Sequence, residues 1–244
     1  VLMEEELRNA IAGDELTVFF QPQIRQPDHL TGHEVLLRWK HPEHGMISPG
    51  VFIPLAEQSR LILPIGRWVL EQACQKLSEW RTHEGKAELS LSVNVSVVQF
   101  QSDDFISHLA QILDETGAPP HRLKLEVTES LLMDHPERIA KAMLQIREMG
   151  IRFSLDDFGT GYSSLSYLKR LPLDQIKIDQ SFVREVNSST ANAAIVNSII
   201  GLASGLGLEV IAEGVETEEQ RQWLVEHGCN HFQGYLFGKP AQDC

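Results

Sequence analysis

The chain repeats one local pattern, in which a short apolar run rich in β-branched residues is followed by a segment with apolar residues at helical spacing. Most of the short runs are continuously apolar rather than alternating, which is typical of strands buried on both faces. The pattern predicts eight strands, at residues 17–23, 33–39, 89–96, 123–129, 152–158, 175–179, 209–215 and 231–237.

Helical patterns lie between most of these runs, notably at residues 64–80, 137–150 and 190–207. Gly150 is placed to end the second helix, and Asn187–Thr190 supplies a cap for the third. Alternating strands and helices, with no linker in 244 residues, predict a parallel α/β domain, most economically a modified TIM (β/α)8 barrel. A doubly wound open sheet is the alternative.

The loop between the first two predicted strands, residues 24–32, is too short to hold a helix. Strands joined in this way are antiparallel neighbours, because a parallel connection needs a crossover segment. The sequence therefore predicts a barrel with an antiparallel first strand.

Charge and cysteine content exclude several classes of protein. A net charge of −13 argues against binding to a nucleic acid polymer and against direct contact with an anionic membrane. Cys74, Cys229 and Cys244 are isolated, which argues against a disulfide framework or a structural zinc site and favours the reducing cytoplasm. No signal-peptide pattern appears, and no apolar run approaches the roughly 18 residues that span a membrane.

Nearly every predicted strand carries a polar residue within or near its carboxyl-terminal half. In a barrel these strand ends converge on one face, where such enzymes hold their active sites. Charged groups inside apolar runs are costly unless they are paired or bind a metal, so a shared site is expected. The residues are Gln21, Glu34, Asn94, Glu126, Asp156, Asp157, Lys177, Asp179, Glu213 and Gln233.

Glu34, Asn94, Glu126, Asp156 and Asp157 all offer oxygen ligands, which select Mg²⁺ or Mn²⁺ over zinc or copper. Several carboxylates in one place repel one another, so two ions compensate them better than one. Paired ions of this kind suit phosphodiester hydrolysis. Taken singly, the features are less informative: the loop after Asp157 is typical of a turn, and a strand-end lysine such as Lys177 is usually solvated.

Asp156 and Asp157 pose a geometric question, since neighbouring side chains on a strand point to opposite faces. We expect the strand to break there into a loop in which Gly159 and Gly161 supply the backbone freedom. Asp156 would then point into the barrel mouth, while Asp157 would turn back toward a second ion. His41 and His44, in contrast, are interpreted as turn residues.

The segment HEVLLRW at residues 33–39 resembles the signature of the EAL-domain cyclic di-GMP phosphodiesterases, with Val35 where the naming motif has alanine. The resemblance covers essentially the whole chain, and the set of ligand, lysine and glutamate positions is complete. Further matching segments are FFQPQ (19–23), FIPLAEQSRLI (52–62), NVSVVQF (94–100), LEVTES (125–130), DDFGTGYSSL (156–165), LPLDQIKIDQSFV (171–183), IAEGVET (211–217) and FQGYLF (232–237).

The resemblance implies that the chain cleaves one phosphodiester of cyclic di-GMP to give linear pGpG, with two Mg²⁺ or Mn²⁺ ions. It implies that Lys177 holds or helps to deprotonate the attacking water and leaves Lys177 and Glu213 as alternative general bases. Asp179 and Glu213 are further acidic groups near the metals. The implied metal ligands are Glu34, Asn94, Glu126 and Asp156 for the first ion, and Asp156 with Asp157 for the second.

The substrate contacts implied by the resemblance are Gln21, Leu36, Arg38 and Gln233, with Arg38 binding a phosphate. Glu129 is expected to hold the glycine loop rather than to take part in the chemistry. Residues 1–244 are expected to form a single EAL-type domain cut from a longer multidomain protein, cytoplasmic even if its parent is anchored in a membrane.

The expected partners are cyclic di-GMP, a second copy of the chain through the helix after the glycine loop, and upstream sensory or GGDEF-type modules. Two other functions compete with hydrolysis of this bacterial second messenger. One is a catalytically silent cyclic di-GMP receptor, and the other is a barrel enzyme that uses Mg²⁺ for enolate chemistry.

Overall fold

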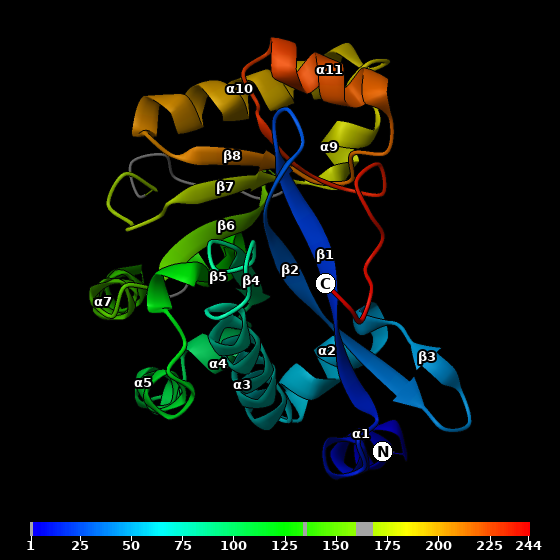
Figure 1. The fold of residues 1–244 in the computed structure, drawn as a ribbon, viewed down its shortest axis with the longest axis vertical. Coiled ribbons are helices and arrows are strands. Elements are labelled where there is room, and N and C mark those ends of the chain that lie inside the picture. Colours follow the sequence, from blue (N-terminus) through cyan, green and yellow to red (C-terminus); the bar gives the residue numbers. More distant parts are fainter. Residues whose placement is uncertain (1, 134–135, 160–167) are drawn as a thin grey trace.

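The computed structural model describes residues 2–133, 136–159 and 168–244, and it shows a closed α/β barrel (Figure 1). Eight strands form the barrel in the order β1-β9-β8-β7-β6-β5-β4-β2, and pairing of β1 with β2 closes it. The predicted barrel is confirmed and the open-sheet alternative is wrong. The strands are β1 (Leu16–Arg25), β2 (His29–His41), β4 (Ser90–Asn94), β5 (Leu123–Thr128), β6 (Arg152–Phe158), β7 (Gln175–Ile178), β8 (Glu209–Ala212) and β9 (His231–Gln233).

Strand β1 runs antiparallel to both of its neighbours, β2 and β9, whereas the other barrel pairs are parallel. The short connection between Arg25 and His29 imposes this hairpin, as predicted from the loop length. Its register places Gln21 opposite Glu34, so the two side chains share the inner face of the barrel.

A short strand that the sequence pattern does not predict, β3 (Gly45–Ile47), pairs with the end of β2 outside the barrel. Helices cover the outside of the sheet (Figure 1). They are α1 (Leu2–Ala12), α2 (Pro49–Gln58), α3 (Ile62–Trp80), α4 (Val97–Phe100), α5 (Phe105–Thr116), α6 (Glu129–Met133), α7 (Pro136–Glu148), α9 (Gln180–Arg184), α10 (Thr190–Leu206) and α11 (Glu218–Glu226).

The helices predicted at 64–80, 137–150 and 190–207 correspond to α3, α7 and α10. Local capping explains where α10 begins and ends: the Ser189 side chain accepts a hydrogen bond from the Asn192 backbone, and Gly207 adopts the left-handed conformation that ends the helix. Among the helices of the described residues, none is long and apolar enough to cross a membrane.

Apolar side chains fill the layer between strands and helices, whereas the inside of the barrel is largely polar. Leu91, Leu125 and Phe153 point outward and are fully buried against helices. Inside, the Lys124 Nζ and the Ser154 hydroxyl both donate to the Gln175 Oε1, at 2.9 and 3.1 Å. Barrels usually fill this space with branched aliphatic side chains, so a polar interior marks this one as built around charged groups.

Candidate active site

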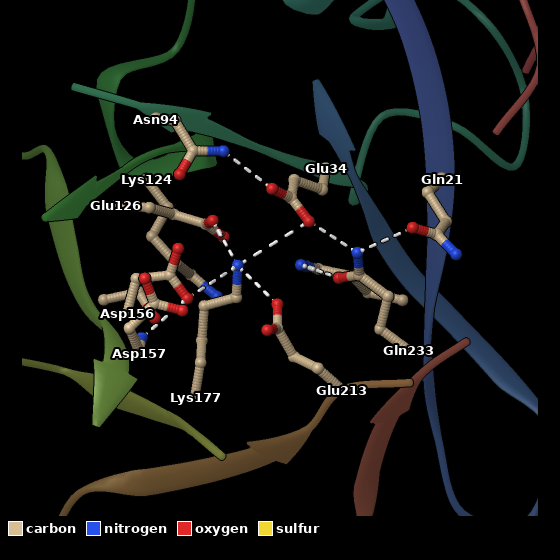
Figure 2. Close-up of polar contacts among 12 residues, drawn as sticks. Gln21, Glu34, Asn94, Lys124, Glu126, Asp156, Asp157, Lys177, Glu213 and Gln233 are labelled. Atoms are coloured by element: carbon tan, nitrogen blue, oxygen red, sulfur yellow. Dashed lines mark hydrogen bonds and ion pairs between the residues drawn. The ribbon is translucent and has the colours of Figure 1, made fainter. Parts of the chain in front are cut away.

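A cavity of about 420 Å³ opens at the carboxyl ends of the barrel strands. Most of the residues predicted from the strand ends meet there, on segments far apart in the sequence (Figure 2). The predicted residues that line it are Gln21, Glu34, Leu36, Arg38, Asn94, Asp156, Lys177, Glu213 and Gln233.

Lys177 lies at the centre of the site, with its Nζ among four carboxylates (Figure 2). The nearest carboxylate oxygens of Glu213, Asp156 and Glu34 lie at 2.6, 3.3 and 3.6 Å, and the Nζ also donates to Glu126. The side chain is 1% exposed, so the solvated position common for a strand-end lysine does not apply. Burial lowers the pKa of Lys177, but the four carboxylates outweigh burial and hold the pKa well above its ordinary value.

Glu34 is held by amide groups as well as by Lys177. Its Oε1 accepts from the Asn94 Nδ2 at 2.7 Å, and its Oε2 accepts from the Gln233 Nε2. The same Gln233 nitrogen donates to the Gln21 Oε1 at 3.0 Å, which joins β9, β1 and β2 (Figure 2). Burial acts to raise the pKa of Glu34, but Lys177 and the amides of Gln233 and Asn94 lower it overall.

Negative charge exceeds positive charge around Lys177. Burial, aided by the charge of Glu34, raises the pKa of Glu126 well above its ordinary value. Burial raises the pKa of Glu213 to about 8, although Lys177 opposes the shift. The Glu126 Oε1 is buried and has no hydrogen-bond partner in the described structure. An oxygen-only donor set with excess negative charge and an unpartnered buried oxygen fits a hard divalent cation.

Asp156 and Asp157 separate by a different route from the predicted one. The pairing of β6 with β7 shifts register between Leu155 and Phe158, and Asp157 itself adopts a left-handed backbone with φ of 55°. The reversal therefore lies in a bulge at the aspartates, before the glycine loop begins. Gly159 also has a positive φ, of 99°, whereas Gly161 lies outside the described residues.

Asp157 lies beside Asp156, and its backbone N–H donates to the Asp156 Oδ1 at 3.0 Å. Partial burial, together with the charges of Asp156 and Asp179, raises the pKa of Asp157. Its side chain is largely exposed at the rim, unlike the groups around Lys177. The two neighbouring carboxylates thus occupy different depths of the same mouth.

Two predicted residues lie apart from the Lys177 cluster. Asp179 caps α9, where its Oδ1 accepts from the Ser181 backbone at 2.9 Å and from the Ser181 hydroxyl. Glu129 begins α6 and is buried, and neither of its carboxylate oxygens has a hydrogen-bond partner in the described structure. The loop that Glu129 is predicted to hold lies mostly in residues 160–167, outside the described residues, as does much of the segment predicted to pair two copies.

The cavity wall also contains residues that the sequence reasoning missed, among them Gln180, Arg184, Glu216 and Tyr235. Gln180 and Arg184 lie one helical turn apart on α9, directly after a predicted site residue, and this spacing could have indicated them. Tyr235 follows a strand-end glycine and is 57% exposed, with the Lys239 Nζ 5.4 Å from its ring centroid.

Away from this mouth, Glu6, His41 and His44 bring one potential ligand atom each within 4.8 Å of one another. However, the His41 Nδ1 accepts the backbone N–H groups of Glu43 and His44, at 3.1 and 3.2 Å. The neutral ring therefore carries its proton on Nε2, the nitrogen that faces Glu6, and cannot offer a lone pair there. His44 lies in the turn after β2, as predicted, whereas the prediction is wrong for His41, which is the last residue of β2 and pairs with Gly45 of β3.

The closed barrel, its antiparallel first strand and the acidic site at the carboxyl ends define a TIM-barrel-like α/β protein. The family model of the EAL domain matches residues 4–240, and the chain belongs to this family.

Known relatives agree with this assignment. The chain is 43% identical over 236 residues to the bifunctional diguanylate cyclase/cyclic di-GMP phosphodiesterase MucR of Pseudomonas aeruginosa, covering 96% of this chain and 34% of MucR. It is 42% identical over 238 residues to the signaling protein YkoW of Bacillus subtilis, covering 97% of this chain and 30% of YkoW. The chain thus spans about a third of the length of these curated relatives.

Solved structures share the fold over nearly the whole chain. A structure described as the PaMucR phosphodiesterase in complex with c-di-GMP has a TM-score of 0.96 and 42% identity, and the match covers 100% of this chain and 98% of that one. The FimX EAL domain from Pseudomonas aeruginosa bound to c-di-GMP has a TM-score of 0.87 and 25% identity, covering 98% and 96%.

Proposed function

We propose that this chain is a metal-dependent phosphodiesterase that hydrolyses one phosphodiester of cyclic di-GMP to linear pGpG. The observation that carries the proposal is the Lys177-centred cluster, in which four carboxylates and the amides of Asn94 and Gln233 converge in one open cavity. The proposal is supported by the family, whose member MucR carries this activity in its name.

Glu34, Asn94, Glu126 and Asp156 would hold the first Mg²⁺ or Mn²⁺ ion. Asp156 with Asp157 would hold the second, with Asp179 nearby. Bound ions supply positive charge to phosphate oxygens and lower the pKa of a coordinated water. In the described structure Lys177 offsets part of the carboxylate charge, and the remaining excess is what the ions would neutralise.

The other residues of the cavity would bind and orient the substrate. Arg38 would bind a phosphate oxygen, and it is steadied by a hydrogen bond from Nη1 to the Leu37 carbonyl at 2.9 Å and by the Phe19 ring. Gln21, Leu36 and Gln233 line the same wall. Lys177 would hold the attacking water. Either Glu213, or Lys177 once bound ions offset the carboxylates that now keep it protonated, would take the proton of that water.

The decisive experiment is incubation of the purified chain with cyclic di-GMP and Mg²⁺, with pGpG detected by chromatography. Product formation supports the proposal, whereas no product with either Mg²⁺ or Mn²⁺ overturns it. Glu34→Ala should abolish turnover, because it removes a carboxylate that Asn94, Gln233 and Lys177 all contact. Glu137→Ala, on the exposed surface of α7, is the matched control.

A catalytically silent cyclic di-GMP receptor is the second candidate, because the FimX EAL domain is described only as bound to c-di-GMP. The receptor predicts saturable binding with no pGpG under the same conditions. Calorimetry of binding beside the hydrolysis assay therefore separates the two functions.

We also propose that residues 1–244 act as one cytoplasmic domain of a longer protein, regulated by upstream sensory or GGDEF-type modules and by pairing with a second copy. The short span of the chain relative to MucR and YkoW supports the first part of this proposal. Comparing turnover of dilute monomer with that of dimer tests the second part.

A further inference from the structure

A second cavity, of about 300 Å³, lies at the opposite mouth of the barrel. It shares no lining residue with the candidate active site. Its wall is built from residues at the amino-terminal ends of the parallel strands and from the β1–β2 hairpin. The strand residues of its wall include Ser90, Lys124, Arg152, Gln175, Glu209 and His231.

Positive charge exceeds negative charge in this wall. Its basic side chains, apart from histidine, are Arg25, Arg122, Lys124 and Arg152, and its acids are Glu88 and Glu209. Arg122 is committed to Glu88, since its Nη2 donates to the carboxylate and its Nη1 to the backbone carbonyl of the same residue. Three cations therefore face the single remaining acid, Glu209.

None of these three cations forms an ion pair with a described residue. Glu209 instead accepts a hydrogen bond from the Gln175 Nε2, at 3.4 Å. Arg25 is exposed at the mouth of the cavity, whereas Lys124 is only 4% exposed. The cavity is therefore lined by positive charge at two depths.

The donors of Lys124 and Arg152 are incompletely used. In the described structure Lys124 donates a single side-chain hydrogen bond, to Gln175, although an ammonium has three donors. The Arg152 side chain has no hydrogen bond there, and its Nε is buried without a partner. Lys124 and Arg152 are direct register partners on the paired strands β5 and β6, and burial together with the charge of Arg152 lowers the pKa of Lys124 to about 8.

We propose that this cavity is an anion site that binds a phosphate group. An anion would relieve the repulsion among Arg25, Lys124 and Arg152, which is otherwise costly for partly buried cations. Guanidinium groups match the oxygens of a phosphate, and a lysine adds a point charge. Because the site lies at the other end of the barrel, it does not depend on the proposed hydrolysis.

The test is calorimetric titration of inorganic phosphate into the chain with a chelator present, at ionic strength held constant with chloride. We expect saturable binding that Arg152→Gln and Arg25→Gln each weaken about tenfold, the loss typical of one charge-assisted contact. Arg38→Gln, which removes a cation from the other mouth, is the matched control and should leave this affinity unchanged.

Mapping by amide NMR locates the bound phosphate independently of these variants. Gly85 and Leu89 line the proposed site, whereas Gly214 and Gly234 line the candidate active site. Shifts at the first pair alone support the proposal. Non-saturable binding, shifts at the second pair alone, or loss of binding only in Arg38→Gln overturns it. If Arg152→Gln fails to fold, the exposed Arg25 carries the test.

Two sources of the phosphate group remain to be separated, a free phosphate ion and a phosphorylated nucleoside. A parallel titration with guanosine 5′-monophosphate distinguishes them. Equal affinities assign the site to the phosphate group alone, and tighter binding of the nucleotide shows that the nucleoside also contributes. Both results keep the anion site, and binding of neither overturns it.

Discussion

Lys177 is the residue on which the candidate active site depends most. Its ammonium is buried among Glu34, Glu126, Asp156 and Glu213, so it offsets charge that would otherwise repel. Removing one partner from a buried charged group costs more than the pair contributes, because the remaining charges lose their compensation. The same side chain therefore balances charge in the fold, in addition to the role proposed for it in hydrolysis.

Lys177→Met should lower the free energy of unfolding of the metal-free protein by about 3–5 kcal/mol, since four buried carboxylates lose their counter-charge. Urea denaturation in the presence of a chelator measures the change. Lys141→Met, on the exposed surface of α7, controls for loss of a lysine elsewhere. Equal stability of Lys177→Met and the unmodified chain would contradict the charge balance described above.

Asp157→Asn should reduce turnover of cyclic di-GMP about 100-fold or more, a loss typical of removing one group that stabilises charge in the transition state. Substrate binding should change little, because Asp157 lies at the rim and does not line the substrate cavity. Comparing kcat with the calorimetric Kd separates the two effects. Asp114→Asn, exposed on α5, is the control, and a larger loss in binding than in turnover would refute the assignment.

The buried thiol of Cys74 makes stability fall at alkaline pH. Burial raises its pKa from 9.0 to about 12, so the folded state keeps a proton that the unfolded state releases above pH 9. The unfolded state then binds fewer protons, and stability falls by about 1.4 kcal/mol per pH unit for this thiol. Urea denaturation of Cys74→Ala between pH 9 and 11 should show a shallower loss than the unmodified chain; parallel curves would disprove this.

At the scale of elements, the contact between β2 and β4 leaves no room for a side chain at Gly32. A Cβ there would lie 2.2 Å from the Ser90 carbonyl oxygen of the facing strand. Gly32→Ala should therefore destabilise the fold by about 1–3 kcal/mol, because backbone must shift.

Gly201→Ala is the matched control for this contact, since Gly201 lies in α10 and a Cβ added there would meet no neighbouring side chain or strand within 4 Å. Alanine in an open helical position should stabilise by about 0.5–1 kcal/mol. Thermal and urea denaturation should show that the two substitutions change the stability in opposite directions. Destabilisation of both to the same extent would show that glycine loss, and not the strand contact, is responsible.

The local signals explain which elements were predictable. Short, continuously apolar runs predicted the barrel strands, and loop length predicted the direction of β1. The three-residue β3 has no periodicity of its own and depends on pairing with β2. The left-handed backbone of Asp157 could not be predicted from the sequence either, because it arises from a register shift between β6 and β7.

At the scale of the whole molecule, the excess of carboxylates at one mouth predicts that divalent ions stabilise the fold. Mg²⁺ or Mn²⁺ at a concentration 100 times its Kd should add about 2.7 kcal/mol to the free energy of unfolding. In a chain of this size each kcal/mol raises the Tm by about 2–4 °C. Glu126→Gln should reduce the Tm increase, because it removes a proposed ligand. No increase with either ion would argue against the metal site.

The sequence indicated the candidate active site, because the barrel topology brings the carboxyl-terminal halves of the strands together at one end. It did not indicate how Gln233 links Gln21 to Glu34, since those contacts depend on closure of the barrel between β1, β2 and β9. The sequence did not indicate the proposed anion site at the opposite mouth for a related reason. Lys124 and Arg152 stand near the starts of different strands, and only the pairing of β5 with β6 brings them side by side.

Charged groups near the two ends of the barrel are close enough to interact through its polar interior. Lys124 stands at one end of β5, two residues before Glu126, and its charge acts on both Glu126 and Lys177. A wall of aliphatic side chains would leave this interaction weakly screened, whereas the dipoles of Ser154 and Gln175 can reorient and screen part of it. The interior therefore acts as a local dielectric that weakens the electrostatic interaction between groups at the two ends of the barrel.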